Sequence, residues 1–261
     1  MKLSIALWHS SCLSGSVMNK TSTILAISSG LFFGQAQAEI ESEFHVGYNS
    51  EYIYRGVELG KDAYEYGLDF AGSCDCGLDW SAGIWSISPD GEGDTNNVDE
   101  LDIYASVSKD LGIGSVTAGF TAYTYEGGSG NDDDAEVYLG LSTQQAGLDM
   151  GLTVFYGTDG ALDDQFLLEG TLGFSHELGD GLTANVGIAY GYVYDTGDSG
   201  YARDAGSVYA SATVSFDYTV SGDITFSPYV SYIEGADRNQ ILGADVADDA
   251  VIGGASVSFS F

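Results

Sequence analysis

Apolar and polar side chains alternate with a period of two through most of the chain after residue 39. Successive side chains of a β-strand point to opposite faces, so this pattern is typical of strands with one apolar face. The chain ends on such a segment, Val257-Ser258-Phe259-Ser260-Phe261. A last amphipathic strand with an aromatic end is typical of the strand that closes an outer-membrane barrel. We therefore expect an all-β fold, a transmembrane antiparallel up-and-down β-barrel.

About twelve segments of this kind follow one another, and an even number lets an antiparallel barrel close with both termini on one side. In the first segment we place Phe44, Val46, Tyr48, Tyr52 and Tyr54 on the lipid face. Tyrosines near the segment ends predict an interfacial girdle, because the ring is apolar while the hydroxyl favours water. Strand propensity alone would also enrich tyrosine. The clusters are Tyr52/Tyr54, Tyr64/Tyr66, Tyr123/Tyr125, Tyr190/Tyr192/Tyr194 and Tyr229/Tyr232, of which parity places Tyr123, Tyr125 and Tyr229 on the lumen face.

The connections between the segments alternate between short and long. We expect short turns at Cys74-Asp75-Cys76, Asp110 to Gly114, Gln144 to Gly147, Glu177 to Gly181 and Val220 to Asp223. We expect longer loops at Val57 to Ala63, Ser88 to Glu100, Glu126 to Asp134, Gly157 to Asp164, Asp195 to Asp204 and Glu234 to Asp249. In outer-membrane barrels the tight turns face the periplasm and the long loops face outside. Both termini are therefore expected in the periplasm, with the acidic loops extracellular.

The first 38 residues have the features of a secretory signal peptide. A positive charge at Lys20 precedes a mostly apolar run from Ile24 to Phe33, and Ala36-Gln37-Ala38 forms a small-residue cleavage site. Met18 is an alternative start that would leave a signal of ordinary length. No later stretch approaches the roughly 18 consecutive apolar residues of a transmembrane helix. Residues 39–261 are expected to form one barrel domain in the outer membrane of a Gram-negative bacterium.

Composition agrees with a barrel and excludes nucleic acid as a partner. The chain has 37 Gly, 18 Tyr and 12 Phe but 2 Pro, which favours strands and turns over helices. Two of the seven basic residues lie in the signal, which leaves five against 39 acidic residues. Phosphate contacts need clustered Lys and Arg, so this balance does not suit nucleic acid. The expected partners are outer-membrane lipid, lipopolysaccharide, and small solutes or ions.

Parity assigns an acidic set of side chains to the lumen. Such a wall favours cations over anions in a pore, although the acids could equally keep the surface soluble. About twelve strands leave a narrow lumen that side chains could fill. Two readings stay open: a porin-like channel for passive diffusion, and a structural or adhesive barrel with a closed lumen and functional acidic loops. The selectivity candidates are Glu51, Arg55, Glu65, Asp69, Asp79, Asp102, Glu136, Asp149 and Glu169.

One stretch of the first segment resembles a known family. Ser50-Glu51-Tyr52-Ile53-Tyr54-Arg55-Gly56-Val57, followed by the tyrosine-rich Tyr64 to Phe70, is similar to the N-terminal signature of the TorF-type porins. The resemblance implies a small outer-membrane barrel with a transport role. The chain departs from it at Glu58 to Asp62, where a Ser/Thr/Gln-rich run is typical. Independently of the family, Arg55 is expected to pair with Glu51 or another acid of the wall. Structural charge neutralisation is favoured over solute binding as its role.

Cysteines and acidic loops supply further candidates. Cys74 and Cys76 lie in a turn on the oxidising side, so they favour a small disulfide, while two free thiols remain possible. No cofactor is expected. Carboxylates of the acidic loops could gather Ca²⁺ or Mg²⁺ loosely and bridge to lipopolysaccharide phosphates, although a solvated loop explains them equally well. These carboxylates belong to Asp90, Glu92, Asp94, Asp132, Asp133 and Asp134.

Catalysis is not expected. A hydrolase needs a nucleophile, a base and an orienting group within hydrogen-bond reach. After the signal the histidines are His45, near the start of the first segment, and His176, at a periplasmic turn. Neither position suits the base of an outward-facing hydrolase, which leaves an aspartyl mechanism as the remaining enzymatic alternative.

Overall fold

The computed structural model describes residues 40–90, 99–126, 133–196, 208–234 and 249–261. Within them, twelve strands form one closed antiparallel barrel, in which each strand pairs with its neighbours in the chain. This confirms the predicted fold and strand number. The strands are β1 Glu41–Tyr54, β2 Val57–Ser73, β3 Asp79–Pro89, β4 Asp99–Asp110, β5 Ser115–Glu126, β6 Asp134–Gln145, β7 Leu148–Asp159, β8 Gln165–Gly179, β9 Leu182–Thr196, β10 Val208–Ser221, β11 Ile224–Glu234 and β12 Ala250–Ser260.

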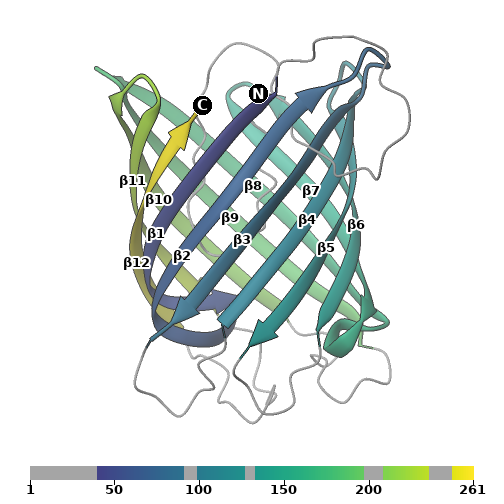
Figure 1. Cartoon of the computed structure of the whole chain (residues 1–261). Helices are drawn as coiled ribbons and strands as arrows, with labels where there is room; N and C mark the ends of the chain where they lie inside the picture. The colour runs from purple at the N-terminus through teal and green to yellow at the C-terminus, as the bar shows by residue number, and fades with distance from the viewer. Residues whose placement is uncertain (1–39, 91–98, 127–132, 197–207, 235–248) are drawn as a thin grey trace.

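The last strand closes the ring against the first, as its alternation predicts. β12 pairs with β1 from Glu43 opposite Ser260 to Asn49 opposite Gly254. Phe44 and Phe259 face each other across this seam, with ring centroids 6.3 Å apart. β1 begins and β12 ends at the same rim of the barrel (Figure 1). We call it the terminal rim and the opposite one the loop rim.

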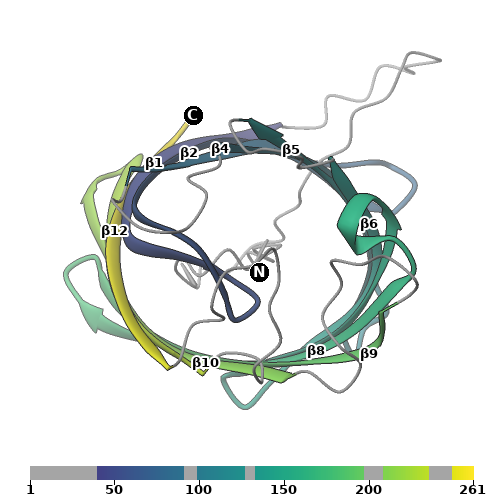
Figure 2. The same cartoon turned by 90° about the horizontal axis from the view of Figure 1, so that it is seen from below.

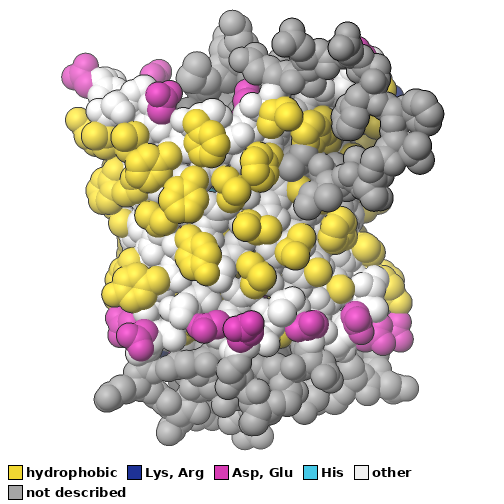
Figure 3. Space-filling view, viewed as in Figure 1, with side chains coloured by type: hydrophobic (Ala, Val, Ile, Leu, Met, Phe, Trp, Pro, Cys, Tyr) yellow, Lys and Arg dark blue, Asp and Glu magenta, His cyan; other side chains and the backbone are white. Residues whose placement is uncertain are grey.

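The outer surface carries an apolar band, and the inner wall is polar. Figure 3 shows the band around the middle of the barrel, with acidic side chains gathered between it and the loop rim. Exposed apolar side chains alternate along each strand with covered polar ones, as Leu139 and Leu141 do with Tyr138 and Gly140 on β6. The inner wall is therefore the face on which small polar residues, acids and tyrosines gather.

Tight turns join strands at the terminal rim. At Ala146-Gly147 and Asp180-Gly181 both residues of the turn have positive φ angles, the type I′ conformation that matches the twist of a hairpin. All five predicted short turns lie between successive strands at this rim. A 3₁₀ turn, η1 (Gly160–Leu162), lies in the connection between β7 and β8 at the loop rim. No helix among the described residues is long and apolar enough to cross a membrane.

One predicted loop is wrong. Val57 to Ala63 belongs to β2, which pairs with β1 up to Tyr54 opposite Val57. The connection is thus reduced to Arg55 and Gly56. The sequence suggests a loop there because Glu58 to Asp62 are polar, yet these residues pair with β1 as an extension of the hairpin.

Candidate functional site in the barrel lumen

The first hairpin leaves the wall and enters the lumen. β1 pairs with β12 only as far as Asn49, and β2 pairs with β3 only from Ala63 onward. Residues 50–62 therefore form a two-stranded ribbon without a further strand on either side among the described residues, and we call it the lumen hairpin. In Figure 2 this dark blue ribbon projects into the ring of strands. Asp62, with a φ of 50°, marks the bend where β2 leaves the wall.

The tip of the lumen hairpin is a two-residue turn with an unusual occupant. Arg55 and Gly56 have φ angles of 49° and 79°, the pattern of a type I′ turn. Asn, Asp and Gly favour this conformation, whereas in other residues the Cβ atom crowds the following carbonyl at a cost of about 1 kcal/mol. Arg55 therefore occupies a strained position, which its side-chain contacts offset.

The guanidinium of Arg55 makes a two-pronged ion pair with Glu136 of β6. Nη1 donates to Oε2 at 2.9 Å, and Nη2 donates to Oε1 at 2.8 Å. The two side chains are 6% and 3% exposed, so neither charge is shared with bulk solvent. The hydroxyl of Tyr123 donates to the same carboxylate at 2.7 Å, and the Tyr54 hydroxyl lies 2.8 Å from that of Tyr123. Bidentate pairing of this kind fixes orientation as well as charge.

Aromatic rings enclose the same guanidinium. Its central carbon lies 4.3 Å from the ring centroid of Phe155 on β7 and 4.8 Å from that of Tyr54. A cation over a ring face is stabilised by about 0.5 to 2 kcal/mol, more when water is excluded. Arg55 is thus held by contacts to β6 and β7 together.

Apolar packing fixes the stem of the lumen hairpin. Tyr52 packs against Trp85 of β3, with ring centroids 5.9 Å apart, and donates to Glu100 of β4 at 2.9 Å. On the other side, Ile53 is buried with Ile233 and Ile252 of β11 and β12. These contacts show that the stem of the lumen hairpin is packed against the wall and does not lie loosely over the rim.

The placement of Tyr52 and Tyr54 on the lipid face is wrong. The pairing register shifts between Tyr52 and Ile53, and beyond that point the ribbon turns into the lumen. Tyr123 and Tyr229 are also inside, as parity indicates. Exposed tyrosines do lie on the outer surface near the rims, and the hydroxyl of Tyr48 donates to Asp62 at 2.6 Å. These exposed tyrosines are Tyr48, Tyr64, Tyr66, Tyr190, Tyr192, Tyr218 and Tyr232.

The acids of the inner wall are tied to polar neighbours. Glu65 accepts from Asn49 at 3.1 Å, and Asn49 accepts from Tyr229 at 2.5 Å. Asp69 accepts from Tyr104 and lies 3.5 Å from the Nδ1 atom of His45.

Farther around the wall, Glu169 accepts from Tyr209. Asp217 accepts from Asn185 at 2.9 Å and from Ser227 at 2.7 Å. These bonds give the acidic wall a defined arrangement, in which tyrosine, serine and asparagine donors orient the carboxylates.

The predicted lumen residues divide into three groups. Glu65, Asp102, Glu136 and Glu169 are buried on the inner wall near the loop-rim ends of the paired strands, while Asp69 lies nearer the terminal rim. Asp79 and Asp149 lie beside turns of the terminal rim, where they accept from Ser73 and Gln144 at 2.8 Å each. Glu51 and Arg55 belong to the lumen hairpin. Arg55 pairs with Glu136, another acid of the wall, while Glu51 lies 3.7 Å from Lys61.

Sequence reasoning missed the aromatic side chains around Arg55. Tyr54 and Phe155 contact the guanidinium, and Tyr123 binds its partner. Parity placed Tyr123 inside, so the acid–tyrosine pairing at Glu136 had a signal in the sequence. The inward turn of the lumen hairpin had a weaker one, which is the Arg-Gly pair between two strands.

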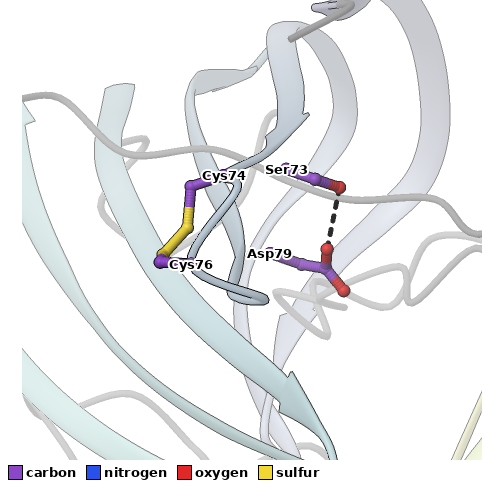
Figure 4. The surroundings of a disulfide bond; sticks show 4 residues. All are labelled: Ser73, Cys74, Cys76 and Asp79. Atoms are coloured by element: carbon purple, nitrogen blue, oxygen red, sulfur yellow. Dashed lines mark hydrogen bonds between the residues drawn. A yellow bond between two sulfur atoms is a disulfide. The ribbon is translucent and has the colours of Figure 1, made fainter. Parts of the chain in front are cut away.

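The cysteines lie in the first turn of the terminal rim. The sulfur atoms of Cys74 and Cys76 are bonded, with Cα atoms 5.1 Å apart, and the hydroxyl of nearby Ser73 donates to Asp79 (Figure 4). The disulfide closes a very small loop between β2 and β3, well away from the lumen hairpin.

The acidic-loop metal candidates are not gathered into a site among the described residues. No group of three or more potential ligands lies together there. Asp134 instead accepts from the backbone N–H groups of Ala161 and Leu162 and so holds η1. Asp90 and Asp133 are exposed, whereas Glu92, Asp94 and Asp132 lie outside the described residues.

Comparison with known families identifies the chain. A family model described as "Bacterial protein of unknown function (Gcw_chp)" matches residues 34–167, just over half of the chain. The chain belongs to the Gcw_chp family. The match covers the lumen hairpin and both β6 and β7, which supply the partners of Arg55. No curated protein matches the chain.

Solved outer-membrane barrels share the fold of this Gcw_chp protein. NanC porin is 18% identical with a TM-score of 0.52, and the alignment covers 84% of this chain and 98% of that one. KdgM porin is 12% identical with a TM-score of 0.51, covering 84% and 99%. The COG4313 outer membrane channel from Pseudomonas putida F1 is 8% identical with a TM-score of 0.58, covering 90% and 100%. At these identities the likeness shows the barrel fold.

Proposed function

We propose that this protein is a porin-like channel of the bacterial outer membrane, through which small solutes diffuse passively and cations pass more readily than anions. The observation that carries the proposal is the acidity of the described inner wall. Its carboxylates extend from the terminal rim to the loop rim, and the basic side chains beside them are already paired. Arg55 binds Glu136, and Lys61 lies within 4 Å of both Glu51 and Glu58. A wall of one sign concentrates ions of the opposite sign.

The proposal includes an orientation and a membrane partner. The short turns and both termini would face the periplasm, and the long acidic connections would face outside, in contact with lipopolysaccharide. The periplasm is an oxidising compartment, which suits the disulfide between Cys74 and Cys76. We also propose membership in the TorF-type porins, supported by the stretch Ser50 to Val57.

The acidic wall also bears on which class of solute can pass. KdgM porin has been solved in complex with oligogalacturonate, an acidic saccharide. An acidic saccharide would meet carboxylates along the present lumen, so we propose that small cations and neutral solutes are carried here instead. A like-charge encounter in a narrow passage raises the barrier to entry.

We propose no enzymatic activity. His176 lies beside a turn of the terminal rim and stacks on Phe174, with ring centroids 6.3 Å apart. His45 lies beside Asp69, whose other oxygen accepts from Tyr104. This arrangement is that of a structural network, in which the carboxylate orients two neighbours.

Planar-bilayer recording tests the channel function. Purified protein in a KCl gradient should give discrete current steps and a reversal potential of the sign that K⁺ permeation produces. Oligogalacturonate added on the loop side should leave the K⁺ current unchanged. A complete lack of steps would instead favour the closed adhesive barrel, and a chloride-selective reversal potential would contradict the role of the acidic wall.

A further inference from the structure

The lumen hairpin reaches from one side of the barrel to the other. It extends from β1 and β2, whereas Glu136 and Phe155, which contact Arg55, lie on β6 and β7. The strands follow one another in chain order around the ring of twelve, so β7 lies opposite β1, and β6 is the neighbour of β7. The contacts of Arg55 therefore bridge the lumen, and the ribbon in Figure 2 crosses part of the opening.

We propose that Arg55 is the residue that limits which cations pass. Its ion pair with Glu136 holds the lumen hairpin across the passage and makes this level the constriction of the channel. The inference rests on the proposed channel function and adds to it the residue that sets the size limit.

The first argument is mechanical. A two-stranded ribbon without flanking strands is marginally stable in water and needs packing to keep one position. The stem is packed through Tyr52 and Ile53, and the tip is held by the ion pair of Arg55 together with the contact between Tyr54 and Tyr123. Loss of Arg55 would leave the Glu136 carboxylate buried without its cation, which is unfavourable, so water and ions would enter beside it. The tip would then keep the contact between Tyr54 and Tyr123 but would lose the charged part of its bridge across the lumen.

The second argument is conformational. The turn at Arg55 and Gly56 strains an arginine, although asparagine or glycine would relax it. A strained residue persists where its surroundings over-determine it, and such residues gather at functional sites. The two-pronged contact to Glu136 and the two aromatic rings hold Arg55 in this strained conformation.

The third argument is electrostatic. At the constriction the pair is neutral as a unit, whereas Glu100, Asp102 and Glu169 remain on the surrounding wall. The constriction would therefore exclude by size, while the wall around it selects by charge. Removal of Arg55 should widen the passage and leave the negative charge of Glu136 unpaired. Removal of Glu136 should widen it and leave the positive charge of Arg55 unpaired.

The experiment compares variants in planar bilayers, with K⁺ and tetraethylammonium chloride as probes. Purified protein carries Arg55→Gln, Glu136→Gln, the exchange Arg55→Glu with Glu136→Arg, or Lys61→Gln. Lys61→Gln is the matched control, because it removes one positive charge from the same hairpin without touching the bridge. Heat-modifiable migration on gels confirms that each barrel is folded, and the exchange keeps the test open if one single variant fails to fold.

The two single variants at the bridge should raise the K⁺ conductance at least about twofold and admit tetraethylammonium, with cation preference stronger in R55Q and weaker in E136Q. The exchange should return the conductance toward that of the natural protein, and K61Q should leave it near that value. Silent natural protein with conducting R55Q would support the bridge while refuting passive conduction by the intact channel. Equal currents, or equal silence, in natural protein and R55Q would overturn the role of Arg55.

Discussion

Two adjacent glycines at the closing seam differ in what they can accommodate. A Cβ atom on Gly254 would lie 2.3 Å from the backbone oxygen of Tyr48 on β1 and 2.5 Å from the ring of Tyr229. A Cβ atom on Gly253 would meet nothing nearer than 3.6 Å. Because the contact at Gly254 is with the backbone of the neighbouring strand, an alanine at position 254 must push β1 away from β12.

We therefore expect Gly254→Ala to lower the free energy of unfolding by about 1 to 3 kcal/mol, the usual range for overpacking. Gly253→Ala is the matched control and should change it by less than about 0.5 kcal/mol. Urea titration of the barrel in lipid vesicles, followed by heat-modifiable gel migration, measures both. Equal midpoints for the two variants would show that the seam yields more easily than its geometry indicates.

Residue by residue, the sequence predicts which face a side chain takes wherever the strand stays in the wall. Alternation places Glu65, Glu136 and Glu169 inside, and all three are buried there. It fails at Tyr52 and Tyr54 because a register shift and an inward bend reverse the faces at the end of β1. The partner of Arg55 lies 81 residues away, so local pattern gives no means of choosing it among the acids of the wall.

At the scale of elements, the lumen hairpin is an addition to a ring whose strand pairing is closed without it. The seam with β12 ends at Asn49, and the pairing with β3 begins at Ala63, so the strand pairing that closes the wall does not involve the residues between. Ser50 and Asp62 stand on opposite strands of the ribbon at its base. A two-residue turn could therefore join Ser50 to Asp62 in place of the lumen hairpin.

Replacement of residues 51–61 by Asn-Gly should consequently give a folded barrel with a wider lumen, because this dipeptide favours the type I′ turn. Heat-modifiable migration should persist, and tetraethylammonium should carry current through the shortened protein. The contrary outcome, an unfolded chain, would mean that the packing of Tyr52 and Ile53 supports the wall itself. The natural protein is the control for both measurements.

The strands and short turns were predictable from the sequence because they follow from the period of two and from turn residues. The lumen hairpin was not, since a strand that leaves the wall keeps the same alternation as one that stays. The polarity of Glu58 to Asp62 indicated a solvent-exposed loop. In the structure this segment is polar because it borders an acidic lumen, where Lys61 lies near Glu51 and Glu58.

At the scale of the whole molecule, the apolar band and the polar wall should respond differently to a charge. Leu152 on β7 is 47% exposed on the outer face, and its neighbour Thr153 faces the lumen opposite Glu169. Leu152→Arg should cost about 2 to 4 kcal/mol of unfolding free energy in vesicles, the penalty for a charge in the lipid-facing band. Thr153→Arg should cost less, because it meets a carboxylate. Urea midpoints of the two variants measure the difference, and a smaller loss for L152R would contradict a lipid-facing band.

The selectivity of the proposed channel should depend on salt. Fixed charges act over about 10 Å in 0.1 M salt and about 3 Å in 1 M salt. If the whole wall selects cations, the reversal potential at a fixed KCl ratio should fall toward zero as both concentrations are raised tenfold. A reversal potential that stays constant would point to one close binding site in place of a distributed field.

The seam between β1 and β12 has a consequence for the time course of folding. Every other strand pairs with its neighbour in sequence, whereas this contact joins Phe44 to Phe259. Contacts between residues so far apart form late, because a long loop must first be closed. Until the final strand docks, β1 and β11 each present an unpaired edge that can recruit another chain. The rate-limiting and aggregation-prone stage of assembly should therefore be the wait for residues 250–260.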